Sequence, residues 1–328
     1  MDPAWAGRRA LVTGGSGFVG RALLSALAVR GAECWNLSRH EAPPGLLPRH
    51  PALHGLRGSV ADTDAVGAAL ARARPDVVFH LAAQPLVGQA RQDPSGTFEV
   101  NIAGTWRLLD ACRRLDKPPR VVMVSSDQAY GPPQQRRIEE THPLAGRQPY
   151  DVSKSCADLL AQSFALTYSL PLGIARLANV FGPGDLNFSR LVPGSLRAAL
   201  SGQPPLIRSD GTPTRDIVAL PDVVDALLSL ADVLNDADFV GRAYNIASGQ
   251  SLSVLAITRL VLEAAGRCDI QPTVLGESAG EVHHKDIDIG AAARDLGWAP
   301  RHSLPQRLAE TAAWYRENEP LWRAAATG

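Results

Sequence analysis

The sequence predicts an α/β fold, a doubly wound parallel sheet of the Rossmann kind, with a smaller C-terminal substrate-binding domain. Short apolar runs alternate with helical patterns through the first half of the chain, the order found in parallel sheets with helices on both faces. A glycine-rich turn follows the first run, and proline and glycine become frequent after residue 182. We expect the Rossmann domain over residues 1–180, with 216–248 returning to it, and the second domain mainly over 181–328.

The individual elements are expected where the hydrophobic pattern changes its period. Short apolar runs that end at turn residues indicate buried strands, and apolar residues at helical spacing indicate helices. The strands are expected at residues 9–13, 34–37, 77–82, 121–125, 173–177 and 243–247, the last rejoining the first sheet. The helices are expected at residues 19–30, 61–74, 97–115, 150–168, 222–234, 254–265 and 304–318.

The composition limits the kinds of partner. Lys plus Arg equals Asp plus Glu at 33 each, so no overall charge draws the protein to nucleic acid or to an anionic membrane surface. Four scattered cysteines without Cys-x-x-Cys spacing argue against a disulfide framework. No apolar run reaches membrane-spanning length and the start lacks a signal-peptide core, so we expect a soluble, cytoplasmic protein.

The turn Thr13-Gly-Gly-Ser-Gly-Phe-Val-Gly20 stands between an expected strand and an expected helix, where a dinucleotide fingerprint belongs. One glycine permits the tight turn, one lets the backbone approach a pyrophosphate, and one allows the helix to pack closely on the strand. The helix N-terminus attracts the negative charge. We therefore expect NAD or NADP, bound here by Gly14, Ser16, Gly17, Phe18, Val19 and Gly20.

The end of the second strand bears on the choice of cofactor. NAD-binding folds usually place an acidic residue there to hold the ribose hydroxyls, but this chain has Ser38 and Arg39. A serine followed by an arginine can make room for a ribose 2′-phosphate and neutralise it, which favours NADP. Arg39 can equally be a solvated loop residue, so NAD and NADP both stay open.

Tyr150 and Lys154 are four residues apart in an expected helix, so their side chains lie on one face, one turn apart. A phenol with a pKa of about 10 is mostly protonated at neutral pH, and a neighbouring ammonium group lowers that pKa. Together with the glycine turn and with Ser125-Ser126 after an expected strand, this spacing indicates an oxidoreductase site.

These segments, in this order, resemble the extended short-chain dehydrogenase/reductase family, specifically its nucleotide-sugar epimerases and dehydratases. Segments 80–87 and 185–193 look most like the branch of CDP-glucose 4,6-dehydratases. The resemblance covers nearly the whole chain. It rests on the glycine turn, His80-Leu-Ala-Ala83, Asn101 with Gly104-Thr105, Ser125-Ser126, Tyr150 with Lys154, Arg176-Leu-Ala-Asn179, Gly182-Pro-Gly184 and Thr214-Arg-Asp216.

The resemblance implies roles for these residues. Tyr150 would take the hydroxyl proton of a sugar as hydride leaves for the nicotinamide, and the charges of Lys154 and of the nicotinamide ring would lower its pKa. Ser126 would hydrogen-bond the reacting oxygen. Asn101 would support the helix geometry or hold a water near Lys154. The further residues expected at the cofactor are Ser59, Val60, Leu81, Ala82, Ala83, Asn101 and Lys154.

Asp127 and Gln128 bear on the outcome of the reaction. A 4,6-dehydratase must also remove the C5 proton and protonate the departing C6 hydroxyl, and the resembling dehydratases use Asp-Glu or Asp-Lys for this. A glutamine amide cannot exchange a proton near neutral pH, whereas Asp127 could act alone or cap a turn. We therefore favour a 4-epimerase that works by transient C4 oxidation and hydride return. A CDP-glucose-like 4,6-dehydratase is the alternative, followed by a 4-keto-sugar reductase and a non-catalytic cofactor-sensing module.

The resemblance also implies a nucleotide diphosphate sugar as the substrate, held by arginine and backbone donors. Relatives pair two long helices, which implies a homodimer with a four-helix interface made by residues 97–115 and 150–168. His283 and His284 lie near Glu281 and Asp286, but no third ligand stands at a suitable spacing, so we expect no metal site. The expected substrate contacts are Gln84, Asn179, Arg190, Leu191, Val192 and Arg215.

Overall fold

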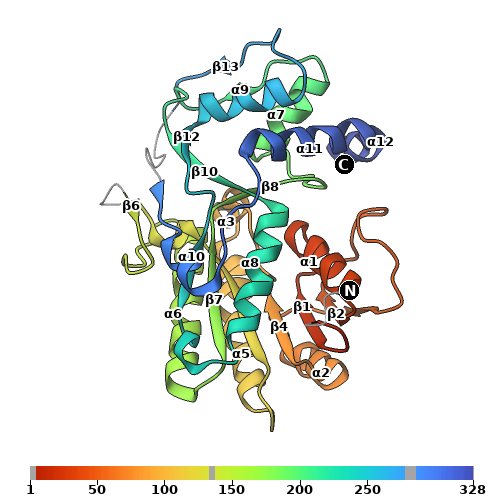
Figure 1. The fold of residues 1–328 in the computed structure, drawn as a ribbon, viewed down its shortest axis with the longest axis vertical. Coiled ribbons are helices and arrows are strands. Elements are labelled where there is room, and N and C mark those ends of the chain that lie inside the picture. Colours follow the sequence, from red (N-terminus) through yellow and green to blue (C-terminus); the bar gives the residue numbers. More distant parts are fainter. Residues whose placement is uncertain (1–4, 133–136, 278–285, 328) are drawn as a thin grey trace.

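A seven-stranded sheet forms the centre of the molecule (Figure 1). The computed structural model describes residues 5–132, 137–277 and 286–327. All neighbouring strands of this sheet are parallel, which confirms the predicted α/β fold with a doubly wound sheet. The strand order is β11 (Ala243–Ile246), β7 (Leu172–Leu177), β5 (Arg120–Ser126), β4 (Val77–His80), β1 (Arg9–Thr13), β2 (Glu33–Ser38) and β3 (Leu53–Arg57).

The strand order reverses between β1 and β4. Strands β2 and β3 extend to one side of β1, while β4, β5, β7 and β11 extend to the other. Doubly wound sheets bind their ligands in the crevice outside the carboxyl ends of the strands at such a point. The glycine turn after β1 and the segment after β4 both begin at this crevice. The strand expected at 243–247 is β11, and it pairs with β7 at the edge of the sheet.

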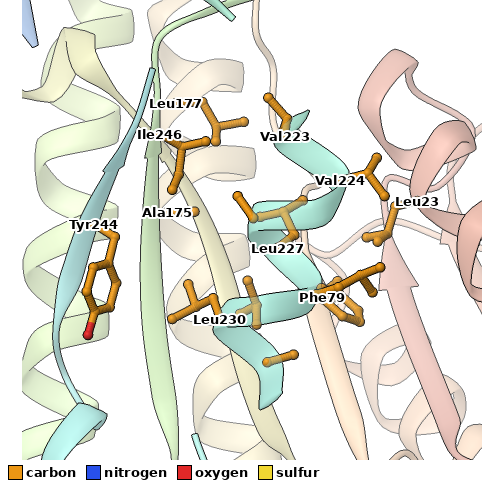
Figure 2. Packing of buried hydrophobic residues seen from close by; sticks show 14 of the residues in the cluster. Leu23, Phe79, Ala175, Leu177, Val223, Val224, Leu227, Leu230, Tyr244 and Ile246 are labelled. Atoms are coloured by element: carbon orange, nitrogen blue, oxygen red, sulfur yellow. The ribbon is translucent and has the colours of Figure 1, made fainter. Parts of the chain in front are cut away.

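Helices cover both faces of the sheet and enclose two apolar cores. On one face α1, α8 and α10 pack on the strands, and on the other face α2, α5 and α6 do so. Figure 2 shows the first core, in which Leu227 and Leu230 of α8 lie near Phe79 and Ala175 of the sheet. The helix bounds are α1 (Phe18–Val29), α8 (Leu220–Val233), α10 (Gly290–Leu296), α2 (Thr63–Ala73), α5 (Gly104–Arg113) and α6 (Pro149–Tyr168).

A third apolar core lies beyond the carboxyl ends of the strands, because β8 follows β7 directly and starts a separate three-stranded sheet. Helices α7, α9 and α11 contribute Leu196, Ile257 and Leu308 to this core and gather at one end of the molecule (Figure 1). The elements are β8 (Asn179–Phe181), β10 (Thr214–Ala219), β12 (Ser251–Ser253), α7 (Leu191–Leu200), α9 (Val254–Ala264) and α11 (Leu304–Glu317).

The helix expected at 97–115 is interrupted by one π-helical turn, η1 (Glu99–Ala103), between α4 (Pro94–Phe98) and α5. Such turns are common at functional sites, and this one carries Asn101. The remaining short elements are α3 (Val87–Gln92), η2 (Asp127–Tyr130), β6 (Arg137–Ile138), β9 (Leu206–Ile207), η3 (Ala237–Phe239), β13 (Thr273–Val274), β14 (Asp286–Ile287) and α12 (Glu319–Thr327).

Candidate active site

The glycine turn between β1 and α1 forms a cradle that a dinucleotide fits. Gly14 has a φ of +75°, and a Cβ at this position would lie 2.8 Å from backbone atoms of Ala82, so glycine alone suits the turn. A Cβ on Gly20 would lie 2.4 Å from the Gly14 carbonyl oxygen. Gly17 caps α1 without a side-chain hydrogen bond. The first amide groups of α1 are therefore available to a pyrophosphate, and the residues present fit NAD(P).

Ser38 and Asn36 support this cradle from β2. The Ser38 hydroxyl accepts a hydrogen bond from the Ser16 N–H (3.2 Å) and donates one to Asn36 Oδ1 (2.7 Å). Ser38 is buried, while Arg39 is exposed. The Ser38 hydroxyl, which was expected to make room for a ribose phosphate, is thus hydrogen-bonded within the protein. The preference for NADP stays a prediction. Sequence analysis missed Asn36, although alternate residues of a strand share one face.

The other predicted cofactor contacts lie along the same edge of the sheet. Ser59 and Val60 follow β3, and the segment 81–83 follows β4. The Leu81 and Ala82 N–H groups donate to the backbone oxygen and the hydroxyl of Thr13. The carboxyl ends of β1, β3 and β4 therefore bring these residues together around the crevice, as expected for parallel strands.

His80 links the glycine turn to the helix that carries Asn101. Its Nδ1 lies 2.8 Å from the Thr13 hydroxyl and its Nε2 lies 3.0 Å from the Thr105 hydroxyl. Thr105 donates its own proton to the Asn101 carbonyl oxygen, so the Thr105 oxygen accepts from His80 and the imidazole carries its proton on Nε2. Burial, with a smaller effect of Lys154, lowers the pKa of His80 to about 3. The ring is therefore neutral and serves as a structural link.

The structure brings the predicted catalytic residues together. Tyr150 lies in the first turn of α6, which begins with Pro149, and Ser126 ends β5. A hydrogen bond joins the side chains of Tyr150 and Ser126. The Ser126 hydroxyl also donates to Asp127 Oδ1 (3.2 Å) and accepts from the Gln128 N–H. Asp127 is buried and Gln128 is half-buried, so a hydroxyl, a phenol and a carboxyl share one small region.

The electrostatics of Tyr150 differ from the sequence-based prediction. Burial raises the pKa of the Tyr150 phenol to about 12, the bond to Ser126 lowers it, Asp127 raises it, and Arg190 lowers it. The cation that acts on the phenol in this structure is therefore Arg190. Lys154 Nζ donates to the Val124 carbonyl oxygen at 3.1 Å. Burial lowers the pKa of Lys154 to about 8, and Asp158 opposes this effect.

Asn101 supports the backbone around the site. Its side-chain oxygen accepts from the Gln84 N–H, and its amide nitrogen donates to the Gln84 carbonyl oxygen and to Ser153 Oγ. Ser153 in turn donates to the Tyr150 carbonyl oxygen at 2.7 Å. Asn101 therefore fixes the geometry of α6, the first of its two expected roles. Gln84 was predicted to contact the substrate. In the structure its side chain instead makes hydrogen bonds to the Leu86 backbone and to the Thr97 hydroxyl, and these bonds fix the turn.

Arg190 stands between the cofactor cradle and Tyr150. Its guanidinium lies 5.9 Å from the centre of the Phe18 ring and pairs with Asp185 at 3.0 Å. Arg21, which sequence analysis missed, donates from one nitrogen to the Ser16 carbonyl and from another to the Gly184 carbonyl, both at 2.8 Å. The glycine turn and the segment after Gly184 are thereby tied together, which places the predicted phosphate contact Arg190 beside the cofactor cradle.

The other predicted substrate residues lie on the small sheet and on α7. Asn179 is exposed at the start of β8, and Arg215 is half-buried near the start of β10. Val192 is 3% exposed in the third core, and Leu191 packs against that core. Helix α7 begins at Leu191 and buries its apolar face, so the Val192 side chain points into the core. The predicted contact of this side chain with the substrate is not seen.

The predictions about a metal site and about membrane-spanning segments can be compared only with the described residues. His283, His284 and Glu281 lie outside the described residues. Among the described residues no group of three His, Cys, Asp or Glu side chains is placed to hold a metal ion. Within the same residues, none of the helices has the length and apolar character to cross a membrane.

Comparisons with known proteins place the chain in a family. It matches the model of the NAD dependent epimerase/dehydratase family over residues 10–247. The dTDP-glucose 4,6-dehydratase of Mycolicibacterium smegmatis is 30% identical over 325 residues, covering 96% of this chain and 95% of that protein. An epimerase of Methanothermobacter thermautotrophicus has a TM-score of 0.90 at 28% identity, covering 98% and 96% of the two chains. The dTDP-glucose 4,6-dehydratase of Streptomyces venezuelae, solved with NAD, has a TM-score of 0.86 at 28% identity, covering 97% and 99%.

The fold and these comparisons define the class of enzyme. A Rossmann sheet with a glycine cradle for NAD(P) and a smaller C-terminal region is the architecture of an extended short-chain dehydrogenase/reductase. Within that class, the chain belongs to the NAD-dependent epimerase/dehydratase family, as the sequence resemblance implied.

Proposed function

We propose that the protein is an NAD(P)-dependent 4,6-dehydratase of a nucleotide diphosphate hexose. The observation that carries this proposal is the buried carboxyl of Asp127, which accepts a hydrogen bond from Ser126. Its charge raises the pKa of Tyr150, which opposes the use of that phenol as a base. A 4-epimerase needs no carboxyl at this position. A 4,6-dehydratase does, because it must move protons at C5 and C6. The dehydratases among the relatives support the same choice.

The first step is oxidation of the sugar at C4. Tyr150 takes the proton of the C4 hydroxyl while Ser126 holds the same oxygen by a hydrogen bond. Arg190 supplies positive charge that favours the phenolate of Tyr150. When bound, NAD(P) supplies an acceptor for the C4 hydride and later returns that hydride to the sugar.

Elimination follows from the new C4 ketone. The ketone makes the C5 proton acidic, and Asp127 removes it. The same carboxyl then delivers the proton to the C6 hydroxyl, the C6–O bond breaks, and water leaves. One carboxyl can serve both positions because C5 and C6 are neighbours, so the neutral amide of Gln128 is not needed for proton transfer. With hydride returned at C6 by a bound cofactor, C5 would take up a proton from solvent, and Tyr150 would release to solvent the proton that it took from the C4 hydroxyl. The result would be a 4-keto-6-deoxy sugar.

The second candidate is the 4-epimerase favoured by the sequence, and Gln128 is the observation that supports it. The side chain stands next to Asp127 and offers no exchangeable carboxyl or amine. Tyr150 would take the C4 hydroxyl proton, a bound NAD(P) would accept the C4 hydride, and return of that hydride to the opposite face would complete the reaction. The epimerase from M. thermautotrophicus, with nearly the same fold, is consistent with this candidate.

A product assay with Asp127→Asn separates the two candidates. The purified protein is incubated with UDP-, GDP-, CDP-, ADP- and dTDP-hexoses, and the products are followed by NMR. We expect one nucleotide sugar to lose its C6 hydroxyl and gain a methyl signal. Asp127→Asn should slow this reaction about a hundredfold to ten-thousandfold, the range for loss of an acid/base group. An epimerised sugar without a methyl signal, formed equally by Asp127→Asn, would contradict the dehydratase.

We further propose that the substrate diphosphate is held by Arg190 and Arg215, with Asn179 nearby. Arg190 lies between the cofactor cradle and Tyr150, and guanidinium groups match phosphate oxygens well. The division into a Rossmann domain over 1–180 with 216–248, and a nucleotide-sugar-binding domain over the rest of 181–328, belongs to the same proposal. The third core around α7, α9 and α11 supports it. A cytoplasmic location stays a prediction of the sequence.

We propose a homodimer through α5 and α6. These two helices lie side by side, with Arg113 of α5 over the ring of Tyr168 of α6 at 4.4 Å. The two helices carry four large apolar side chains that are 42 to 79% exposed, and exposed apolar side chains of this size favour a protein interface. The residues concerned are Trp106, Leu159, Leu166 and Tyr168.

Leu166→Lys should convert this dimer into a monomer, because a charge would be buried in the interface. Val29→Lys is the matched control, since Val29 is 71% exposed on α1, away from α5 and α6. Analytical ultracentrifugation measures both variants. A wild-type monomer, or a Leu166→Lys protein that sediments as the wild-type dimer does, would rule out this interface.

A further inference from the structure

Arg21 lies on α1 and is a buried side chain for which the mechanism above has no use. It is 8% exposed. One of its nitrogens donates to the Ser16 carbonyl oxygen and another to the Gly184 carbonyl oxygen, both at 2.8 Å. Both acceptors are backbone oxygens of turns. Because a guanidinium is costly to bury, its place between these two turns indicates a role in the site.

The segment that follows Gly184 is held from two sides. Arg21 holds it from the side of α1 and the glycine turn. From the side of α11, the hydroxyl of Tyr315 donates to the Asp185 carbonyl oxygen, and the Tyr315 ring is buried in the third core. Loss of the Arg21 guanidinium would therefore free the segment from the glycine turn but leave it attached to the third core.

Asp185 transmits the position of this segment to Arg190. The buried Asp185 carboxylate accepts from the Asn187 N–H with one oxygen and from Arg190 Nη1 with the other, both at 3.0 Å. The Arg190 N–H also donates to the Asn187 carbonyl oxygen. The Arg190 side chain is 36% exposed, so a ligand can reach it while Asp185 holds it. Its placement beside the cofactor cradle therefore depends on where the segment lies.

We propose that Arg21 is a positioning residue that acts through Arg190 and holds it where the diphosphate of the substrate binds. This inference rests on the proposed function, in which Arg190 contacts that diphosphate. A guanidinium that is already in place binds a phosphate without a further loss of side-chain freedom. Arg21 need not touch the nucleotide for this effect. Because its other hydrogen bond goes to Ser16, it fixes Arg190 relative to the bound cofactor.

The test is a double-mutant cycle on nucleotide binding. UDP, GDP, CDP, ADP and dTDP are titrated into the protein by calorimetry, with NAD and NADP in excess so that the cofactor cradle stays filled. The tightest binder is then titrated into each variant. Arg190→Met should raise its Kd about tenfold to a hundredfold, the range for a lost hydrogen bond to a charged group. Arg21→Met should raise it at least about threefold, and the double variant should bind no more weakly than Arg190→Met alone.

Arg30→Met is the matched control, because Arg30 ends the same helix and pairs with Asp225 of α8. It should keep the wild-type Kd. A general loss of stability would not depend on the residue at position 190, so the cycle separates positioning from a structural role. Arg21→Lys keeps the charge but lacks the fork that reaches both carbonyl oxygens. It should show a smaller loss that also vanishes beside Arg190→Met, and it serves if Arg21→Met does not fold.

The outcomes that overturn the two proposals differ. Wild-type affinity in Arg190→Met would overturn the proposed diphosphate contact and this inference with it. If Arg190→Met binds weakly, wild-type affinity in Arg21→Met overturns the inference alone. Losses that add up in the double variant do the same, because Arg21 would then act independently of Arg190.

Discussion

Tyr150→Phe should reduce kcat by about a hundredfold to ten-thousandfold, the range for a lost acid/base group, and leave NAD(P) bound. The phenol oxygen lies at the end of β5 with Ser126, whereas the cofactor cradle is built by Gly14, Gly17 and Gly20 on another loop. Removing one oxygen therefore removes the base without disturbing the cradle. Turnover of the nucleotide sugar by NMR and the content of bound cofactor by absorbance check both parts.

Tyr168→Phe is the matched control for this variant. Tyr168 is on the same helix, but it is half exposed and its ring lies beside Arg113 on the outer surface. It should keep wild-type kcat. Wild-type turnover by Tyr150→Phe would remove Tyr150 from the chemistry and with it the mechanism derived above.

Arg176→Met should lower the free energy of unfolding by about 3 to 5 kcal/mol, the usual loss when one partner of a buried ion pair is removed. Arg176 of β7 binds both oxygens of Asp158 on α6 at 2.9 Å, and the two side chains are 3% and 0% exposed. The variant leaves the Asp158 charge buried without its partner. Because Asp158 lies one turn beyond Lys154, the same pair also anchors the catalytic helix to the sheet. Urea unfolding measures the loss.

Two controls separate this effect from a general loss of charge. Arg323→Met breaks an exposed pair with Glu319 on α12 and should cost less than about 1 kcal/mol. The double variant Arg176→Met with Asp158→Leu should recover much of the stability, because no buried charge remains. Equal losses in Arg176→Met and Arg323→Met would contradict a special role for the buried pair.

Most of the large sheet could be predicted because its strands are short, apolar and buried on both faces. The strand at 9–13 is β1 without any shift, and the helix at 150–168 is α6 with one more residue at its start. Strand β3 was missed because its residues are exposed or half exposed at the sheet edge, so they carry no apolar run. Strand β10 was missed because it starts with the polar residues Thr-Arg-Asp, which interrupt an apolar run. Its parallel partner β8 begins 35 residues earlier, at Asn179, so no local pattern indicates the pairing.

The site could be predicted where its residues stand in one short segment. The glycine turn and the pair Tyr150 and Lys154 have this property, since their spacing fixes their geometry. Contacts between distant segments left no local signal. The bond from Arg21 to the Gly184 carbonyl joins residues 163 positions apart, and the bond from Tyr315 to the Asp185 carbonyl joins residues 130 positions apart. The raised pKa of Tyr150 was also hidden, because it depends on how deeply α6 buries the phenol.

A rapid-mixing experiment on the protein with its bound cofactor tests the central claim, that the oxygen of Tyr150 starts an oxidation of a nucleotide sugar at C4. The nucleotide hexose found in the product assay is mixed with the enzyme, and the near-ultraviolet absorbance of reduced nicotinamide is followed through one turnover. The account predicts an absorbance that rises and then decays as product forms, and that is abolished in Tyr150→Phe. Product formation with no rise in absorbance, or the same rise in Tyr150→Phe, would contradict it.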